Sequence, residues 1–178
     1  MNTLIVTSGK IKGSCSFIAE KLLMRIKNAE IIELSNYNIS FCDGCLTCDE
    51  SGRCHYDDDM LNILEKVKQA KNLIFITPVR WNLLSGNLKV FLDRLNPFAV
   101  PELLSGKSAG IIAVGQTSVE KSHSIVSAIE SVANFCESAN IQIIYRYGIG
   151  DCLTRNDTIA HQSEIEENIK KLANLLEK

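Results

Sequence analysis

The sequence has few aromatic residues, only three prolines and no excess of charge of either sign. Aromatic residues make up 6% of the 178 residues, so a single tryptophan in a loop is an informative position. The formal net charge of −2 argues against a protein that binds nucleic acid or a membrane surface, because such proteins carry a basic excess or stripe. We therefore expect neither nucleic acid nor membrane among its partners.

Long apolar runs are also missing. No stretch approaches the length of a membrane span, and the apolar residues that follow Met1 are too few for a signal peptide and lack a basic segment before them. We expect a cytoplasmic protein. With 46% apolar and 22% charged residues, a chain of this length fits a single domain over residues 1–178.

Short apolar runs alternate with helical patterns along the whole chain. The runs predict five strands, over residues 3–7, 30–34, 73–77, 108–115 and 141–147. The first helical pattern has an apolar face of Ile18, Leu22, Leu23 and Ile26. Continuous apolar strands that alternate with helices predict an α/β fold with a parallel sheet covered on both faces.

Polar residues at the expected helix starts predict how the helices are capped. Ser14 or Ser16 is expected to cap the first helix, and the run Asp57–Asp59 to cap a later one, in preference to binding a metal. Ser163 and Glu166 have the spacing of a capping box at the start of the last helix.

Seven cysteines is a large and odd number, and four of them lie on one segment in the pattern Cys42-x2-Cys45-x2-Cys48-x5-Cys54. In a reducing compartment this favours metal or redox chemistry over disulfides. Repeated x2 gaps let thiolates converge on one centre, which favours an iron–sulfur cluster over zinc. The alternative is a reduced loop that shapes a pocket or a subunit contact. Residues 36–58 show no regular period and are predicted to be a functional insertion loop.

Three polar loops follow predicted strands, at residues 8–16, 77–85 and 115–123. Parallel sheets bind ligands beyond the carboxyl ends of their strands, at the switch in strand order. In the order 2-1-3-4-5 the first and third strands flank that switch point. We therefore expect a ligand between the first two of these loops.

The first loop has the composition of a phosphate site. Hydroxyl groups and the free amides at a helix start can surround a phosphate. The hydroxyls here belong to Ser8, Ser14 and Ser16, and Lys10 or Lys12 can add positive charge. The alternative is an ordinary turn before a capped helix. The fingerprints of P-loops and of dinucleotide-binding loops are both absent.

The second loop contains the only tryptophan, Trp81, at a strand end. A planar ligand could stack there, and Arg80 could offset negative charge on it. The alternatives are a tryptophan packed on the next helix and a solvated arginine.

With both loops in view, the chain resembles the superfamily of NAD(P)H-dependent FMN reductases and iron–sulfur flavoproteins. The first loop is similar to its phosphate motif G-S-P-R-x-x-G-N-[ST], and the second segment to its motif S-P-V-Y-W-x-x-x-[ST]-G-x-L-K-x-F-x-D-R. The matching residues of the second motif are Pro78, Val79, Trp81, Ser85, Gly86, Leu88, Lys89, Phe91, Asp93 and Arg94. Gly9, Ser14 and Arg80 depart from the usual Pro, Asn and Tyr.

The resemblance implies a flavodoxin-like fold, with strand order 2-1-3-4-5, that binds FMN. The implied phosphate ligands are Ser8, Lys10, Ser14, Cys15 and Ser16. The residues implied to line the isoalloxazine ring are Pro78, Val79, Arg80, Trp81 and Asn82, with Gly115, Gln116 and Thr117 beside its pyrimidine side. The implied cluster ligands are Cys42, Cys45, Cys48 and Cys54. As a cysteine at a helix start, Cys15 is expected to have a lowered pKa. A plain substitute for the Ser or Thr of the phosphate motif is favoured over a reactive thiol.

The resemblance also implies an activity. We expect an FMN-dependent oxidoreductase that takes electrons from NAD(P)H and passes them to a quinone, a flavin or another small acceptor, without a dedicated acid–base residue. The alternatives are a ferredoxin-coupled electron carrier with FMN and [4Fe–4S], and a scaffold protein without flavin. Relatives assemble as homodimers or homotetramers, so a homo-oligomer is expected.

Overall fold

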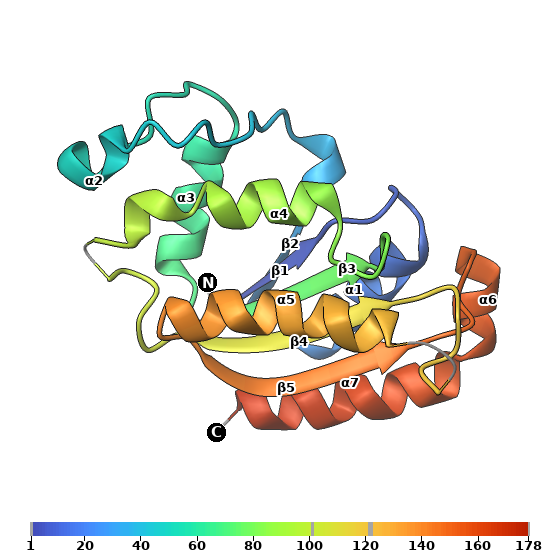
Figure 1. Ribbon diagram of the computed structural model, residues 1–178. Helices are drawn as coiled ribbons and strands as arrows, with labels where there is room; N and C mark the ends of the chain where they lie inside the picture. The colour runs from blue at the N-terminus through green and yellow to red at the C-terminus, as the bar shows by residue number, and fades with distance from the viewer. Residues whose placement is uncertain (1, 101, 121–122, 178) are drawn as a thin grey trace.

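The computed structural model describes residues 2–100, 102–120 and 123–177. Its centre is a parallel sheet in the order β2-β1-β3-β4-β5 (Figure 1). The strands are β1 Thr3–Thr7, β2 Ala29–Glu33, β3 Asn72–Pro78, β4 Ser108–Val114 and β5 Gln142–Ile149. The predicted fold and strand order are confirmed, and the predicted strand ends are in error by no more than two residues.

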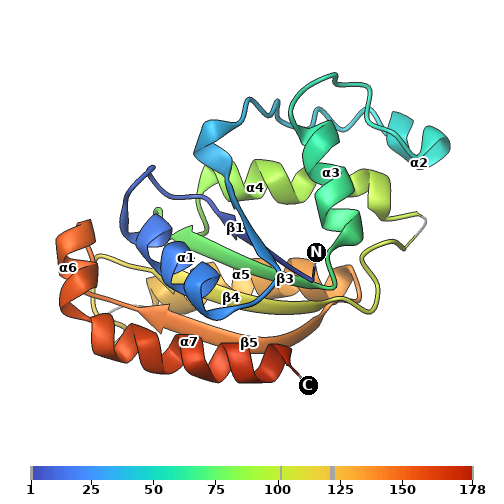
Figure 2. The same cartoon turned by 180° about the vertical axis from the view of Figure 1, so that it is seen from behind.

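Helices cover both faces of the sheet, as the two opposite views show (Figures 1 and 2). One face carries α3 Met60–Gln69, α4 Gly86–Asp93 and α5 Ser124–Ser138, and the other carries α1 Ser14–Arg25, α6 Arg155–Ala160 and α7 Gln162–Leu176. Each layer has its own apolar core, because alternate strand residues such as Leu4 and Ile5 point to opposite faces. Among the described residues, no helix is both long enough and apolar enough to cross a membrane.

The predicted helix starts are wrong in two places, at α1 and at the last helix. Gly13, not a serine, is the N-cap residue of α1. A capping box does form, but at Thr154 and Asp157 at the start of α6. Ser163 lies inside α7, because α6 ends at Ala160 and His161 alone separates the two helices. The sequence pattern could not reveal that the chain forms two successive helices here.

The predicted apolar face of α1 is also one residue too wide. Ile18 and Leu22 are fully buried, but Leu23 is 43% exposed because it lies beyond the stripe that faces the sheet.

The cysteine-rich segment, residues 36–58, extends over α3 and α4 (Figure 1). It was expected to be irregular, but it contains one short helix, α2 Thr47–Ser51. The residues that flank this helix, Leu46 and Gly52, both have a left-handed backbone conformation. Short 3₁₀ turns at Leu34–Asn36 (η1) and Asn96–Phe98 (η2) complete the elements.

The acidic run before α3 anchors this segment. Asp58 Oδ2 accepts a hydrogen bond from Ser40 N at 2.9 Å, and Asp59 Oδ2 accepts one from Asn38 N at 2.7 Å. Asp59 is the N-cap residue of α3 but its side chain caps nothing; Asp58 Oδ1 instead accepts from Met60 N at 3.1 Å. The predicted capping role is therefore only partly correct, because Asp58 Oδ2 and Asp59 Oδ2 bind backbone amides of the preceding loop.

Candidate functional site

A cavity of about 370 Å³ lies at the carboxyl ends of the strands. The loops that follow β1, β3, β4 and β5 all contribute to its lining, which includes Lys10, Ser14, Cys15, Arg80, Gln116 and Arg155. A second hollow of about 340 Å³ adjoins it and shares Gly9, Lys10, Pro78 and Arg80. The two hollows therefore lie where the rule for parallel sheets places a ligand.

The loop after β1 forms a tight turn. Gly13 N donates to Lys10 O at 2.8 Å, Ser16 Oγ donates to the same oxygen at 3.3 Å, and Lys12 has a φ of +57°. A side chain at Gly13 would bring its Cβ within 2.7 Å of Lys10 O, so only glycine fits this turn. The turn directs the chain into α1 at the edge of the cavity.

The first turn of α1 leaves backbone amides available to a ligand. Phe17 N is the first amide to bond within the helix, to Gly13 O at 3.0 Å, and no side chain caps the helix start. The amides of Ser14, Cys15 and Ser16 precede it and have no helical acceptor. Free amides at a helix N-terminus favour an anion such as a phosphate.

Four basic side chains surround this helix start: Lys10, Lys12, Arg80 and Arg155 line the 370 Å³ cavity. None of the lining residues is acidic among those the structure describes. The cavity is therefore suited to an anionic ligand.

Arg155, at the start of α6, is a charged lining residue that sequence reasoning missed, and the lining residues Cys152, Leu153 and Thr154 before it were missed as well. Its Nη2 lies 2.6 Å from Glu20 Oε2, its Nη1 lies 3.3 Å from Glu20 Oε1, and its guanidinium stacks over the Phe17 ring at 5.2 Å. These contacts with α1 fix the guanidinium at the wall of the cavity. The sequence indicated this position only by an arginine some residues after the last predicted strand.

Only some of the residues predicted to bind the phosphate line the cavity with their side chains. Lys10, Ser14 and Cys15 line the cavity, whereas the hydroxyl of Ser8 donates to Ile76 O at 3.2 Å and that of Ser16 donates to Lys10 O. The last two hydroxyls therefore hold the loop in shape. Ser8 also lines the second hollow.

The pKa of Cys15 was expected to be low and is in fact high. Cys15 is 2% exposed, and its burial raises the pKa to about 12, although Arg80 acts in the opposite direction. The prediction fails because desolvation outweighs the effect of the helix start. Cys15 is a neutral thiol in the cavity wall.

The loop after β3 is a two-residue hairpin. Arg80 and Leu83 exchange backbone hydrogen bonds of 2.9 Å in both directions, and Trp81 and Asn82 between them have positive φ values of 46° and 65°. Trp81 is 98% exposed at the tip, so it does not pack on the next helix. Pro78, Val79 and Arg80 line the 370 Å³ cavity, and Trp81 and Asn82 line neither hollow.

The loop after β4 packs closely on its neighbours. A Cβ on Gly115 would come within 2.6 Å of Ile125, and one on Gly150 would come within 2.6 Å of Thr117 O. Gly115 N donates to Ile149 O at 2.8 Å. Of the three residues predicted here, Gln116 lines the cavity, while Gly115 and Thr117 form the backbone that supports it.

The four clustered cysteines are free thiols in different surroundings. Cys42 and Cys45 are exposed, Cys54 is half-buried, and the buried Cys48 Sγ accepts a hydrogen bond from Asn96 Nδ2 at 3.0 Å. Thiolates are the donors of an iron–sulfur cluster, but no three of these four sulfurs lie within 4.8 Å of one another in the part of the chain that the structure describes. A further cavity of about 640 Å³ adjoins Cys42 and the ends of α4 and α5, away from the strand ends.

The chain matches the family model described as NADPH-dependent FMN reductase over residues 1–142. It is 37% identical over 86 residues to an iron–sulfur flavoprotein of Methanocaldococcus jannaschii, covering 48% of this chain and 45% of the relative. It is 27% identical over 121 residues to an NAD(P)H-dependent FAD/FMN reductase of Geobacillus thermodenitrificans, covering 64% and 60%. The chain spans about half the length of three iron–sulfur flavoproteins that it matches.

Solved structures share the fold. A flavone reductase superimposes with a TM-score of 0.78 at 16% identity, covering 99% of this chain and 62% of that one. An FMN-dependent NADH-azoreductase of Bacillus anthracis, solved with FMN, gives a TM-score of 0.68 at 17% identity, covering 97% and 100%. At such identities these matches show the fold alone.

Proposed function

Since the chain belongs to the NADPH-dependent FMN reductase family, we propose that it binds FMN at the carboxyl ends of its strands, takes electrons from NAD(P)H and passes them to a small acceptor. The observation that carries the proposal is the basic cavity at the start of α1. It offers three free helical amides and the cationic side chains of Lys10, Lys12 and Arg155 to a phosphate, beside the strand ends where a flat ring would fit.

The residues of this chain would act by binding and orientation. The turn Lys10–Gly13 and the start of α1 would hold the phosphate, and Pro78 to Arg80 and Gln116 would border the ring. When bound, FMN supplies the hydride and electron transfer itself. We propose that Trp81 and Asn82 reach the ring or its substrate from the hairpin tip, and that Gly115 and Thr117 support its pyrimidine side.

A steady-state assay tests the activity. The purified protein, loaded with FMN, is given NADH or NADPH together with a quinone, riboflavin or an azo dye. We expect faster oxidation of the nucleotide than with free FMN at the same concentration. A protein that fails to take up added FMN would contradict the proposal and would favour a flavin-free scaffold.

A second candidate function is that of an iron–sulfur flavoprotein that exchanges electrons with a ferredoxin. It is favoured by the four free thiols Cys42, Cys45, Cys48 and Cys54 and by the likeness to relatives with that name. Anaerobic purification followed by iron analysis tests it. We expect a broad absorbance shoulder near the flavin bands that is lost in Cys42→Ser; iron-free protein from an anaerobic preparation would exclude this candidate.

We further propose that the protein is a cytoplasmic homodimer or homotetramer. Seven free thiols suit a reducing compartment. Phe41 and Trp81, 70% and 98% exposed, are large apolar side chains that a subunit contact would cover. Light scattering after gel filtration should give at least twice the monomer mass of 19.7 kDa, and a monomer at micromolar concentration would contradict it.

A further inference from the structure

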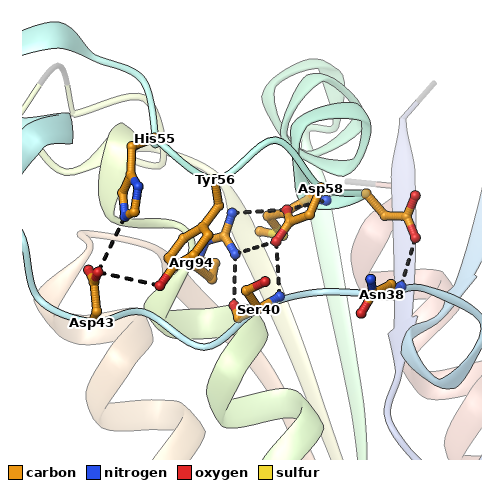
Figure 3. Close-up of polar contacts among 9 residues, drawn as sticks. Asn38, Ser40, Asp43, His55, Tyr56, Asp58 and Arg94 are labelled. Atoms are coloured by element: carbon orange, nitrogen blue, oxygen red, sulfur yellow. Dashed lines mark hydrogen bonds and ion pairs between the residues drawn. The ribbon is translucent and has the colours of Figure 1, made fainter.

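Two side chains just after α4 present N–H groups to the cysteine-rich segment. Asn96, the first residue of η2, donates from Nδ2 to the sulfur of Cys48 at 3.0 Å and to Asp49 Oδ1 at 2.9 Å. Arg94 lies beneath the same segment and binds its backbone (Figure 3). Neither side chain is among the described residues that line the proposed FMN site.

The orientation of the Asn96 amide is fixed by its partners. An ionised carboxylate only accepts hydrogen bonds, so the contact with Asp49 identifies the atom that faces Asp49 and Cys48 as the amide nitrogen. Pro97 and Phe98, the next two residues of η2, are buried and fix the backbone of Asn96. Cys48 itself is only 8% exposed. The hydrogen bond to its sulfur is therefore held in place by packing on both sides.

Arg94 has one N–H group left without an acceptor. Its Nη1 and Nη2 bind Asp58, but its Nε is buried and has no hydrogen-bond partner among the described residues. A buried donor of this kind is costly unless something accepts from it. Burial acts to lower the pKa of Arg94, whereas Asp58 and, in the same direction, the sulfur of Cys54 raise it. The Cys54 sulfur thus lies within electrostatic reach of the guanidinium that carries the unpaired N–H.

These donors suit the group that the four clustered cysteines would hold. The thiolates of a [4Fe–4S] cluster bind different iron atoms, so their sulfurs need not meet at one point as the ligands of a single ion do. A ligating thiolate carries negative charge and accepts hydrogen bonds. Hydrogen bonds to the sulfurs help to set the reduction potential of a cluster, and neighbours that bind the ligands orient them.

We propose that Asn96 and Arg94 are positioning residues for the iron–sulfur cluster of the four clustered cysteines. Asn96 donates from Nδ2 to the sulfur of Cys48, and Arg94 donates from Nε to the sulfur of Cys54. Both donors stabilise negative charge on sulfur, which favours the reduced cluster and raises its potential. The inference rests on the second candidate function, that of an iron–sulfur flavoprotein, and does not depend on FMN binding.

A redox titration of the anaerobically purified protein, followed by the electron paramagnetic resonance of the reduced cluster, tests the proposal. Asn96→Leu removes the donor at similar side-chain size, so we expect a shift of roughly 3- to 10-fold toward the oxidised cluster, where tenfold is about 59 mV for a one-electron couple. Asn96→Asp, which places a carboxylate beside the sulfur, should shift it further. The matched control is Asn174→Leu, exposed on α7 at the other face of the sheet, which should leave the potential unchanged.

Isotope labels in the wild type distinguish hydrogen bonding from a merely structural role. Asparagine labelled with ¹⁵N at its side-chain amide, and arginine labelled with ¹⁵N at Nε, should each give a nitrogen coupling to the reduced cluster. The asparagine coupling should disappear in Asn96→Leu. No coupling from either label, or a potential that Asn96→Leu shifts no more than Asn174→Leu does, would overturn the proposal while the cluster stands. Iron-free wild-type protein would instead remove the second candidate function, and the inference with it.

Discussion

Arg94 and Asp58 form a two-point ion pair beneath the cysteine-rich segment. Arg94 Nη1 lies 2.7 Å from Asp58 Oδ2 and Nη2 lies 3.0 Å from Oδ1, with the two side chains 1% and 8% exposed. Nη1 also donates to Ser40 O at 2.7 Å. The pair therefore joins α4, the start of α3 and the loop, and it holds the loop in position over the fold.

Removal of the guanidinium should destabilise the protein strongly. Arg94→Met leaves Asp58 as a buried carboxylate without its cationic partner, and such losses cost about 3–5 kcal/mol of unfolding free energy. The matched control is Arg146→Met, because Arg146 is 41% exposed and pairs with Glu130 and Glu137 on the surface; it should cost less than about 1 kcal/mol. Urea unfolding measures both. Equal losses in the two variants would contradict the central role of the buried pair.

The same pair should make stability depend on acid pH. Burial acts to raise the pKa of Asp58, but hydrogen bonds from Arg94, Ser40 N and Met60 N outweigh it and lower the pKa below its usual value. A carboxyl with a depressed folded pKa contributes stability above its unfolded pKa of about 4, and this is lost as the pH falls through the folded pKa.

We therefore expect Asp58→Asn to be less stable than the wild type near pH 7 and to lose less stability on acidification below about pH 4. Urea unfolding at several pH values gives both curves, and other carboxyls contribute to the two proteins alike. Curves that run parallel down to about pH 2 would show that Asp58 is not the titrating group.

Arg155 should distinguish FMN from riboflavin. Its guanidinium lines the cavity at the start of α1, where the phosphate would lie. Loss of a charge-assisted hydrogen bond costs about 1.5–3 kcal/mol, so Arg155→Ala should weaken FMN binding roughly 10- to 100-fold and leave the weaker riboflavin binding unchanged. Flavin fluorescence quenching measures both affinities.

Glu20→Gln is the control for this prediction. It keeps the guanidinium and removes only its carboxylate partner, which lies 2.6 Å away, so FMN should bind at least as tightly as in the wild type. If Arg155→Ala weakens both flavins equally, the residue supports the fold of α6 and does not contact the phosphate.

Arg80 should tune the flavin potential. Its side chain lies at both hollows and is solvent-exposed, with Nη1 3.0 Å from Val79 O. A cation there stabilises negative charge on the reduced ring by an amount typical of exposed pairs, up to about 1 kcal/mol. Arg80→Ala should therefore lower the two-electron midpoint potential by roughly 10–20 mV. Lys27→Ala, at the opposite end of the sheet from the loops, should not change it; an unchanged potential in Arg80→Ala would refute the idea.

The fold was predictable because its signals are local and repeated. Each strand is a short apolar run, and Ile74 and Ile111, in the centre of the sheet, are fully buried, as the runs imply. Loop 8–16 was also identifiable, because the turn, the glycine and the helix start lie within a few residues of one another.

The missed features depend on contacts between distant parts of the chain. Arg155 meets Glu20 across 135 residues, and Arg94 meets Asp58 across 36. The pKa of Cys15 follows from burial by the whole fold, which a rule about helix starts does not include. The exposure of Trp81 depends on the hairpin turn and on any subunit contact, neither of which the motif encodes.

The central claim is that one rim of the sheet holds FMN, and a crystal structure with FMN in excess tests it most directly. We predict the phosphate at the amides of Ser14 to Ser16, within hydrogen-bond distance of Lys10 or Arg155, and the ring beside Pro78 to Arg80. An empty rim, or a ring bound in the 640 Å³ cavity near Cys42, would contradict it.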